Sequence, residues 1–355
     1  MSQKTEELWT ILHEAGVVEG DIPQIENPDS PWYVKVMLAF SGWLAALFLL
    51  GFIAIGFEFI IENTVISFFI GALMIGGAFK LLQSPNNEFI EHLAFAISLA
   101  GQALVVFSFF DITRFGDEGV WCLVLLLETI LAFCMPNFVH RVFSSAIATA
   151  SLYMVLNGWG LPVLFVSIIM LLASWVWLNE FRFLKHLGRL RAIGYGLVLA
   201  VIPLKGTALF GYAGMGWSSY SKSELWAYPW LEESILAMVM IYILWHLIQR
   251  INHQVSIPVK SALLLTIPIV CLLSAEAPGF SVGLMIMLLG FAGSNRVLLG
   301  LGIASLLFFI SSYYYLLDVT LLVKSQTLLM TGLILLAVRW CVLRFSTIKL
   351  EVPRV

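Results

Sequence analysis

The stretch WCLVLLLETILAFCM, residues 121–135, decides the fold class of this chain. Only Glu128 and Thr129 interrupt its run of apolar side chains, and the segment extends back to Gly119. A helix that crosses a bilayer needs about 20 predominantly apolar residues, with a range of roughly 17 to 25. The stretch therefore predicts a membrane-spanning helix, and much of the chain repeats the same pattern.

The composition of the whole chain also indicates a membrane protein. Of its 355 residues, 60% are hydrophobic and 12% are charged, whereas soluble domains are roughly 45–50% apolar and about 25% charged. The net charge is −3, and no stripe of lysine and arginine could neutralise a series of phosphates. We therefore expect the lipid bilayer as the main partner and no binding of nucleic acid.

Twelve stretches have the length and composition of a spanning helix. They run approximately over residues 34–57, 64–82, 89–109, 119–135, 138–157, 160–179, 190–213, 231–251, 258–274, 278–293, 296–317 and 325–345. The ninth and tenth are short and interrupted by prolines, so a re-entrant hairpin is the alternative. The sequence predicts an all-α, polytopic transmembrane helix bundle with short loops and about 12 spans, or 10 spans plus a re-entrant hairpin.

The basic residues indicate the orientation of this bundle. All but four of the 19 lysines and arginines fall on one side of the predicted arrangement; the four are Arg114, Lys205, Lys222 and Lys324. Because cytoplasmic loops carry an excess of Lys and Arg, that side is predicted to be cytoplasmic. Both termini lie on it, so the number of crossings is even, whether the total is twelve or ten.

The chain divides into three predicted parts. Residues 1–33 form an acidic cytosolic arm, in which about residues 5–15 make a short amphipathic helix before a proline-containing linker. Residues 34–345 form a single transmembrane helical domain, and residues 346–355 form a basic cytosolic tail. The arm lacks the basic and apolar pattern of a secretory signal peptide.

Glu128 is a candidate functional charge, because it lies inside an apolar span, close to the predicted midplane. A charged side chain costs a few kcal/mol there on insertion scales, so the carboxyl group must be protonated, hydrogen-bonded or paired. It could relay protons or bind a cation. The favoured interpretation is structural: a neutral acid bonded to a Ser, a Tyr or a backbone carbonyl on a neighbouring helix.

Lys205 is the second candidate, in the phrase IPLKG, where Pro203 removes a backbone donor and Gly206 loosens the next turn. A broken helix beside a charge is a feature of many transporter binding sites. The favoured interpretation is that the Lys205 stem extends to the outer interface. If the side chain points inward instead, Glu128 is the expected partner in a buried pair.

Motifs of enzymes are missing from the sequence. It contains no G-x-S-x-G, no H-E-x-x-H and no P-loop, and its four cysteines lie in apolar stretches without C-x-x-C spacing. We therefore expect no enzymatic activity, no cofactor and no metal site.

Two segments carry a resemblance: SPWYVKVMLAFSGWLAALFLLGF at 30–52 and SYYYLLDVTLLVKSQTLLMTG at 312–332. Through them the chain resembles, over nearly its whole length, an uncharacterised family of bacterial polytopic inner-membrane proteins classed as a domain of unknown function. The recurring positions of that family correspond here to Tyr313, Tyr314, Asp318, Lys324 and Ser325. The resemblance implies the bacterial inner membrane and other small membrane proteins as partners, and it supplies no catalytic residue.

Asp318 and Lys324 bracket the predicted outer turn between the last two spans. Lys324 can pair with Asp318 across the turn and so fix the tilt of the two helices, while the tyrosine hydroxyls face the interface. This hairpin clasp is the favoured interpretation. An external recognition site for a ligand or partner is the alternative.

Two functions are favoured over a third, a membrane enzyme, which would usually place several His, Asp or Glu residues at one interface. The first is an inner-membrane protein of unknown biochemical activity with transporter-like passage of a small solute, favoured by the number of spans, the interrupted helix at Lys205 and the buried Glu128. The alternative is a non-catalytic subunit or scaffold of a multi-protein membrane complex, favoured by the short loops and the scarcity of polar residues inside the spans. A transporter should let water reach Glu128 or Lys205, whereas a scaffold should have a sealed core.

Overall fold

A computed structural model describes most of the predicted membrane domain. The described residues are 3–16, 63–83, 88–112, 116–209, 229–251, 279–316 and 320–345, with single helical positions between 37 and 55 and at 267, 270 and 274. All of them are helical or lie in the turns and bends between helices, and this part of the chain contains no strand. The predicted all-α class is therefore confirmed.

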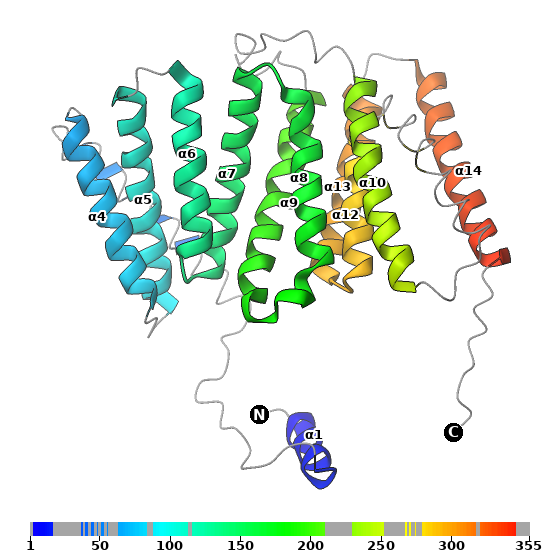
Figure 1. Cartoon of the computed structure of the whole chain (residues 1–355), viewed down its shortest axis with the longest axis horizontal. Helices are drawn as coiled ribbons and strands as arrows, with labels where there is room; N and C mark the ends of the chain where they lie inside the picture. The colour runs from blue at the N-terminus through cyan, green and yellow to red at the C-terminus, as the bar shows by residue number, and fades with distance from the viewer. Residues whose placement is uncertain are drawn as a thin grey trace. The chain divides into compact units, whose positions relative to one another are not determined.

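The helices follow the apolar stretches of the sequence closely (Figure 1). In chain order they are α1 (Gln3–Glu14), α4 (Thr64–Gln83), α5 (Glu88–Ile112), α6 (Gly116–Cys134), α7 (Phe138–Gly158), η1 (Pro162–Leu164), α8 (Phe165–Leu178), η2 (Glu180–His186), α9 (Leu187–Leu209), α10 (Pro229–Ile251), α12 (Phe280–Ala292), α13 (Arg296–Leu316) and α14 (Leu321–Phe345). Most of the first and ninth predicted spans, 34–57 and 258–274, lies outside the described residues.

Five segments among the described residues are long and apolar enough to cross a membrane. They are Thr64–Gln83, Ile90–Asp111, Phe138–Gly158, Glu180–Gly206 and Trp230–Arg250. Shorter apolar helices occupy Pro162–Leu178, Phe280–Ala292 and Arg296–Ser312. The chain thus has the helices of a membrane-embedded protein, while the total of about twelve spans stays a prediction.

The chain divides into two compact units, Met1–Leu104 and Val105–Val355. In the first unit, α4 packs closely on α5 through small residues. A Cβ atom placed on Gly101 would lie 2.7 Å from the carbonyl oxygen of Gly71. The Ser67 hydroxyl, fully buried, donates a hydrogen bond of 3.3 Å to the carbonyl oxygen of Leu104. Lipid tails are as apolar as the helix surfaces, so the hydrophobic effect does not drive membrane helices together. Close approach of the backbones supplies van der Waals packing energy instead.

In the second unit, α7 lies against α6, α8 and α9. A Cβ atom on Gly196 of α9 would lie 2.5 Å from the carbonyl oxygen of Val142 in α7. The Ser145 hydroxyl donates a hydrogen bond of 2.9 Å to the carbonyl oxygen of Ile193, again linking α7 to α9. The run of Ser, Ala and Thr in α7 is typical of a membrane helix that packs closely against its neighbours, and α7 does so here.

The apolar core of the second unit centres on α8. Met170 and Ala173 of α8 have no exposed surface, and they belong to one cluster with Val198 of α9, Ile243 of α10 and Met285 of α12. The core is therefore shared by four helices, α8, α9, α10 and α12.

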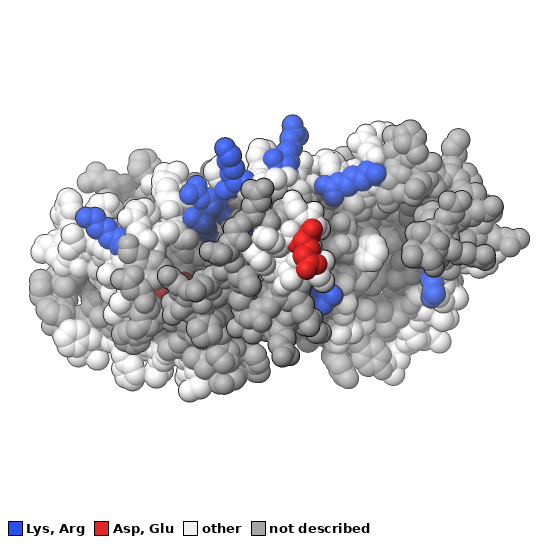
Figure 2. All heavy atoms as spheres, turned by 90° about the horizontal axis from the view of Figure 1, so that it is seen from below, with Lys and Arg blue, Asp and Glu red and all other residues white. Residues whose placement is uncertain are grey.

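Charges separate toward the two ends of the second unit. The end where α8 and α10 finish and α9 and α13 begin carries exposed basic residues, here called the basic end: Arg182, Lys185, Arg189, Arg250 and Arg296. Figure 2 looks onto this side of the molecule and shows lysines and arginines gathered there. The opposite end, where α6 and α10 begin, carries Asp117 and Glu232 in the first turns of those helices.

Candidate functional site

A buried ion pair joins α9 to α10 near the end of the bundle that lies opposite the basic end. Lys205 Nζ donates a hydrogen bond of 2.6 Å to Glu232 Oε2. The two side chains are only 6% and 13% exposed, so the charges are largely removed from solvent. Lys205 follows Pro203, which lies inside α9. The free-energy cost of removing each charge from water is offset by its attraction to the other charge.

Two sequence predictions about Lys205 are therefore wrong. Its side chain does not extend to the interface as a free cation, and its partner is Glu232 rather than Glu128. The sequence does not indicate Glu232 as a buried residue, because it lies at the start of a predicted span, where an acid is expected to face water. The contact between residues 27 positions apart depends on how α9 and α10 pack.

Glu233 places a second acid beside this pair. Its side chain is 3% exposed, and Oε2 has no hydrogen-bond partner among the described residues. Lys205 and Glu232 both act electrostatically on the Glu233 carboxyl group, and the hydroxyls of Ser274 and Ser281 lie beside it. Both serines are fully buried.

The serines come from either side of a turn that precedes α12. Gly279 has a left-handed φ of 91°, and a Cβ atom there would lie 2.4 Å from the ring of Phe309. Only glycine satisfies both conditions without strain. Ser281 then lies in the first turn of α12, and its backbone N–H donates a hydrogen bond of 3.1 Å to Ser274 Oγ. The turn thus brings a helix N-terminus, the positive end of its dipole, next to an acid.

We call Lys205, Glu232, Glu233, Ser274 and Ser281 the ionic cluster. When all of its ionisable groups are charged, one lysine faces two carboxylates, so the cluster carries one net negative charge inside the protein. Binding of one proton or one monovalent cation would neutralise it.

A separate polar group surrounds Glu128 in α6. Its side chain is 1% exposed, Oε2 has no partner among the described residues, and Ser144 of α7 hydrogen-bonds with the carboxyl group. Ser144 in turn is 3.3 Å from Nδ1 of the buried His140. A serine on a neighbouring helix is one of the partners that the sequence predicts, but nothing in it singles out His140.

The position of Glu128 along α6 is defined, while its depth in a membrane stays a prediction. Counting along α6, it lies twelve residues after Gly116 and six before Cys134. At 1.5 Å per residue, it is about 9 Å from the helix end that joins α7 at the basic end. Glu128 is therefore nearer to that end of α6 than to the other, and it belongs to a different group from Lys205.

The predicted hairpin clasp falls at the edge of the described residues. Tyr313 and Tyr314 belong to the last turns of α13, and Lys324 belongs to the first turn of α14, but their side chains lie outside the described part, as does Asp318 altogether. Ser325 is exposed, and its hydroxyl donates a hydrogen bond of 3.0 Å to the carbonyl oxygen of Leu322. Both the clasp and the recognition site stay predictions.

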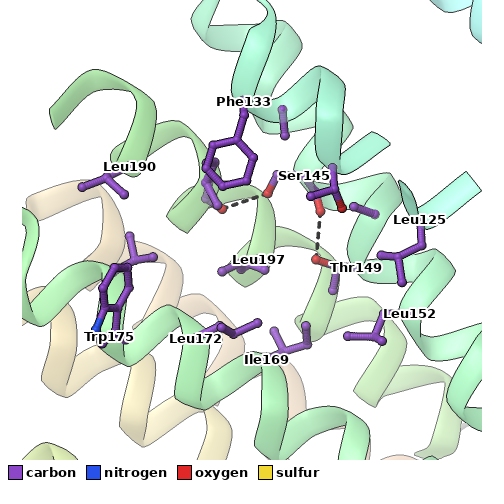
Figure 3. Close-up of a pocket in the computed structure, with 15 residues that line it drawn as sticks. Leu125, Phe133, Ser145, Thr149, Leu152, Ile169, Leu172, Trp175, Leu190 and Leu197 are labelled. Atoms are coloured by element: carbon purple, nitrogen blue, oxygen red, sulfur yellow. Dashed lines mark hydrogen bonds between the residues drawn. The ribbon is translucent and has the colours of Figure 1, made fainter. Parts of the chain in front are cut away.

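An apolar pocket of about 400 Å³ lies among α6, α7, α8 and α9 (Figure 3). Leu125, Ile169 and Leu197 are among the side chains that line it. The hydroxyls of Ser145 and Thr149 also line the pocket, but each donates its proton to a backbone carbonyl. The lining is therefore almost wholly apolar, and no sequence motif marks it.

Comparison with known proteins places the chain in a family. The model of the family described as Domain of unknown function (DUF4401) matches residues 31–345. The chain belongs to this family. No curated protein and no solved structure matches it. The description of DUF4401 assigns no activity. Among the described residues, no group of three or more His, Cys, Asp or Glu side chains could hold a metal ion.

Proposed function

We propose that this DUF4401 protein transports a small solute across the bacterial inner membrane, with the ionic cluster as its proton or cation site. The observation that supports the proposal is the excess acid: Glu233 is buried next to a Lys205–Glu232 pair that is already complete. A buried, unpaired carboxylate inside a membrane bundle is costly, and such residues mark ion and proton pathways.

The ionic cluster lies where binding of an ion could be coupled to a change in helix packing. It joins α9, which contains Pro203 but runs as one helix from Leu187 to Leu209 and is not interrupted as the sequence predicts, to the turn at Gly279 that precedes α12. Transporters bind ions and substrates where helices are discontinuous, because freed backbone groups and helix ends then face the ligand. Neutralising Glu233 would leave the Lys205–Glu232 pair intact but remove the excess charge where α9 meets α10, which gives ion binding a way to alter their packing.

The proposal includes an orientation. The exposed arginines and lysine of the basic end favour a cytoplasmic location for that end, so both termini are cytoplasmic and the ionic cluster is nearer the outer face. About twelve crossings fit this arrangement, and the protein acts without enzymatic chemistry or a cofactor. Partnership with other small membrane proteins is compatible with transport, but a fixed complex would favour the scaffold function.

Access of water to Glu233 tests the proposal. Glu233→Cys would be made in a chain whose four natural cysteines are replaced by alanine, reconstituted in liposomes and treated with a membrane-impermeant maleimide. Two variants serve as matched controls: Asp117→Cys, exposed in the first turn of α6, and Ala173→Cys, fully buried in the core of α8.

A transporter must open the site to water during its cycle. We therefore expect Glu233→Cys to react more slowly than Asp117→Cys but measurably faster than Ala173→Cys. If Glu233→Cys is as unreactive as Ala173→Cys while Asp117→Cys is labelled, the core is sealed and the proposal is wrong. Capture of a stoichiometric partner set from native membranes in mild detergent would then support the scaffold function.

A further inference from the structure

A second pocket, at the basic end, adjoins the apolar pocket. The second pocket has a volume of about 300 Å³ and shares four lining residues with the first: Phe133, Trp175, Leu190 and Ile193. Its lining also includes His186 and Arg189, both exposed. The two pockets therefore adjoin, and together their linings are apolar on one side and basic on the other.

The second pocket is lined by the basic side chains of His186 and Arg189, and neither pocket has an acidic side chain in its lining. Arg189 lies close enough to Arg141 of α7 for the two guanidinium groups to repel each other. Arg141 is only 8% exposed, and its Nε atom has no hydrogen-bond partner among the described residues. Two neighbouring arginines, one of them buried with an unused donor, are suited to an anionic group with several acceptor oxygens.

The rim of the apolar pocket indicates where its occupant comes from. Phe133 is 54% exposed, Leu172 45% and Trp175 46%, although all three are large apolar side chains. In a membrane-embedded bundle, such exposed apolar surface faces lipid rather than water. The pocket is therefore accessible from the hydrocarbon layer, and its volume lies within the usual range of ligand sites.

We propose that the adjoining pockets bind one anionic phospholipid, with an acyl chain in the apolar pocket and the phosphate group at Arg189, which lines the second pocket and lies near Arg141, a residue in neither lining. The polarity of the lining matches the polarity of such a lipid along its whole length. Basic pockets between transmembrane helices are suited to anionic headgroups of the cytoplasmic leaflet, where those lipids attract Lys and Arg. This site is separate from the ionic cluster, so it does not depend on the proposed transport activity.

Native mass spectrometry of the full chain tests the proposal. Dioleoyl phosphatidylglycerol or dioleoyl phosphatidylcholine is added to the protein in detergent, and the lipid that stays bound after the detergent is removed is measured. We expect the wild type to retain one phosphatidylglycerol in preference to phosphatidylcholine. Arg189→Gln should reduce that preference about fivefold, the contribution typical of one basic residue at an anionic surface. The matched control is Arg296→Gln, which removes an exposed arginine from the same end of the bundle outside both pockets.

The apolar part of the site has its own variant. Leu172→Trp fills the rim of the pocket at a partly exposed position, where a larger side chain is accommodated without disturbing the core, and it should weaken binding of both lipids. Glycerol phosphate, which lacks acyl chains, should not compete with phosphatidylglycerol. Equal retention of both lipids by the wild type, or an equal effect of Arg189→Gln and Arg296→Gln, would refute the proposal, as would full competition by glycerol phosphate.

Discussion

Replacing Lys205 by methionine removes the only lysine of the ionic cluster and leaves two buried acids side by side. The separation of 2.6 Å between Nζ and Oε2 corresponds to an attraction on the order of 6 kcal/mol at an effective dielectric constant of about 20. Most of this attraction offsets the cost of burying the two charges. Loss of one partner leaves the other charge buried without compensation, so Lys205→Met should lower the free energy of unfolding by about 3–5 kcal/mol.

The two acids should respond less strongly, and in a fixed order. After Glu232→Gln, Lys205 still has Glu233 within its electrostatic reach and the cluster becomes neutral, so we expect a loss of only about 1.5–3 kcal/mol, the value of a charge-assisted hydrogen bond. Glu233→Gln leaves the ion pair intact and removes the excess charge. Its effect on the free energy of unfolding should stay below about 1 kcal/mol and can be stabilising.

Unfolding of the purified variants by SDS in mixed micelles, followed by circular dichroism, measures these differences. Lys185→Met is the matched control, because it removes an exposed lysine at the basic end and should change the free energy of unfolding by less than about 0.5 kcal/mol. If Lys205→Met is no more destabilised than Lys185→Met, Lys205 reaches water and the pair is not buried. If Glu233→Gln costs as much as Lys205→Met, Glu233 is a required partner rather than an excess acid.

Two further variants test the packing of the second unit. A Cβ atom on Gly302 of α13 would lie 2.5 Å from the amide nitrogen of Met287 in α12, whereas one on Gly300 would meet nothing within 4 Å; thermal unfolding should therefore show that Gly302→Ala loses about 1–3 kcal/mol and Gly300→Ala almost nothing. Ser145→Val removes a hydrogen bond between α7 and α9, whereas Ser151→Val removes one inside α7. Only the first should loosen the bundle, by about 0.6 kcal/mol, and equal losses in the same assay would show that the interhelical bond contributes nothing.

The sequence predicts the helices of this protein well because their main signal is local. An apolar run of sufficient length must form its backbone hydrogen bonds internally in a membrane, and a helix is the way for a single segment to do so. For the same reason, the small side chains of α7 predict that it packs closely against its neighbours, since only small residues let helix backbones approach closely.

The ionic cluster and the apolar pocket are not predictable in this way. Lys205 is visible as an intramembrane charge, but its partner Glu232 is set by how the end of α9 meets the start of α10. Glu233 differs from Glu232 only in the direction that its side chain takes from the helix. The pocket has no sequence signature at all, because it is built from ordinary leucines and isoleucines on four helices.

The central claim is that the ionic cluster takes up a proton or cation from water, and charge displacement in proteoliposomes tests it most directly. On a solid-supported membrane, a step in external pH or Na⁺ concentration should give a transient current, because an ion that enters a buried site crosses part of the low-dielectric layer. Wild type and Asp117→Asn, which removes an exposed acid, should both give this current, and Glu233→Gln should lose it. A current that persists unchanged in Glu233→Gln, or a wild type that gives no more current than empty liposomes, would contradict the claim.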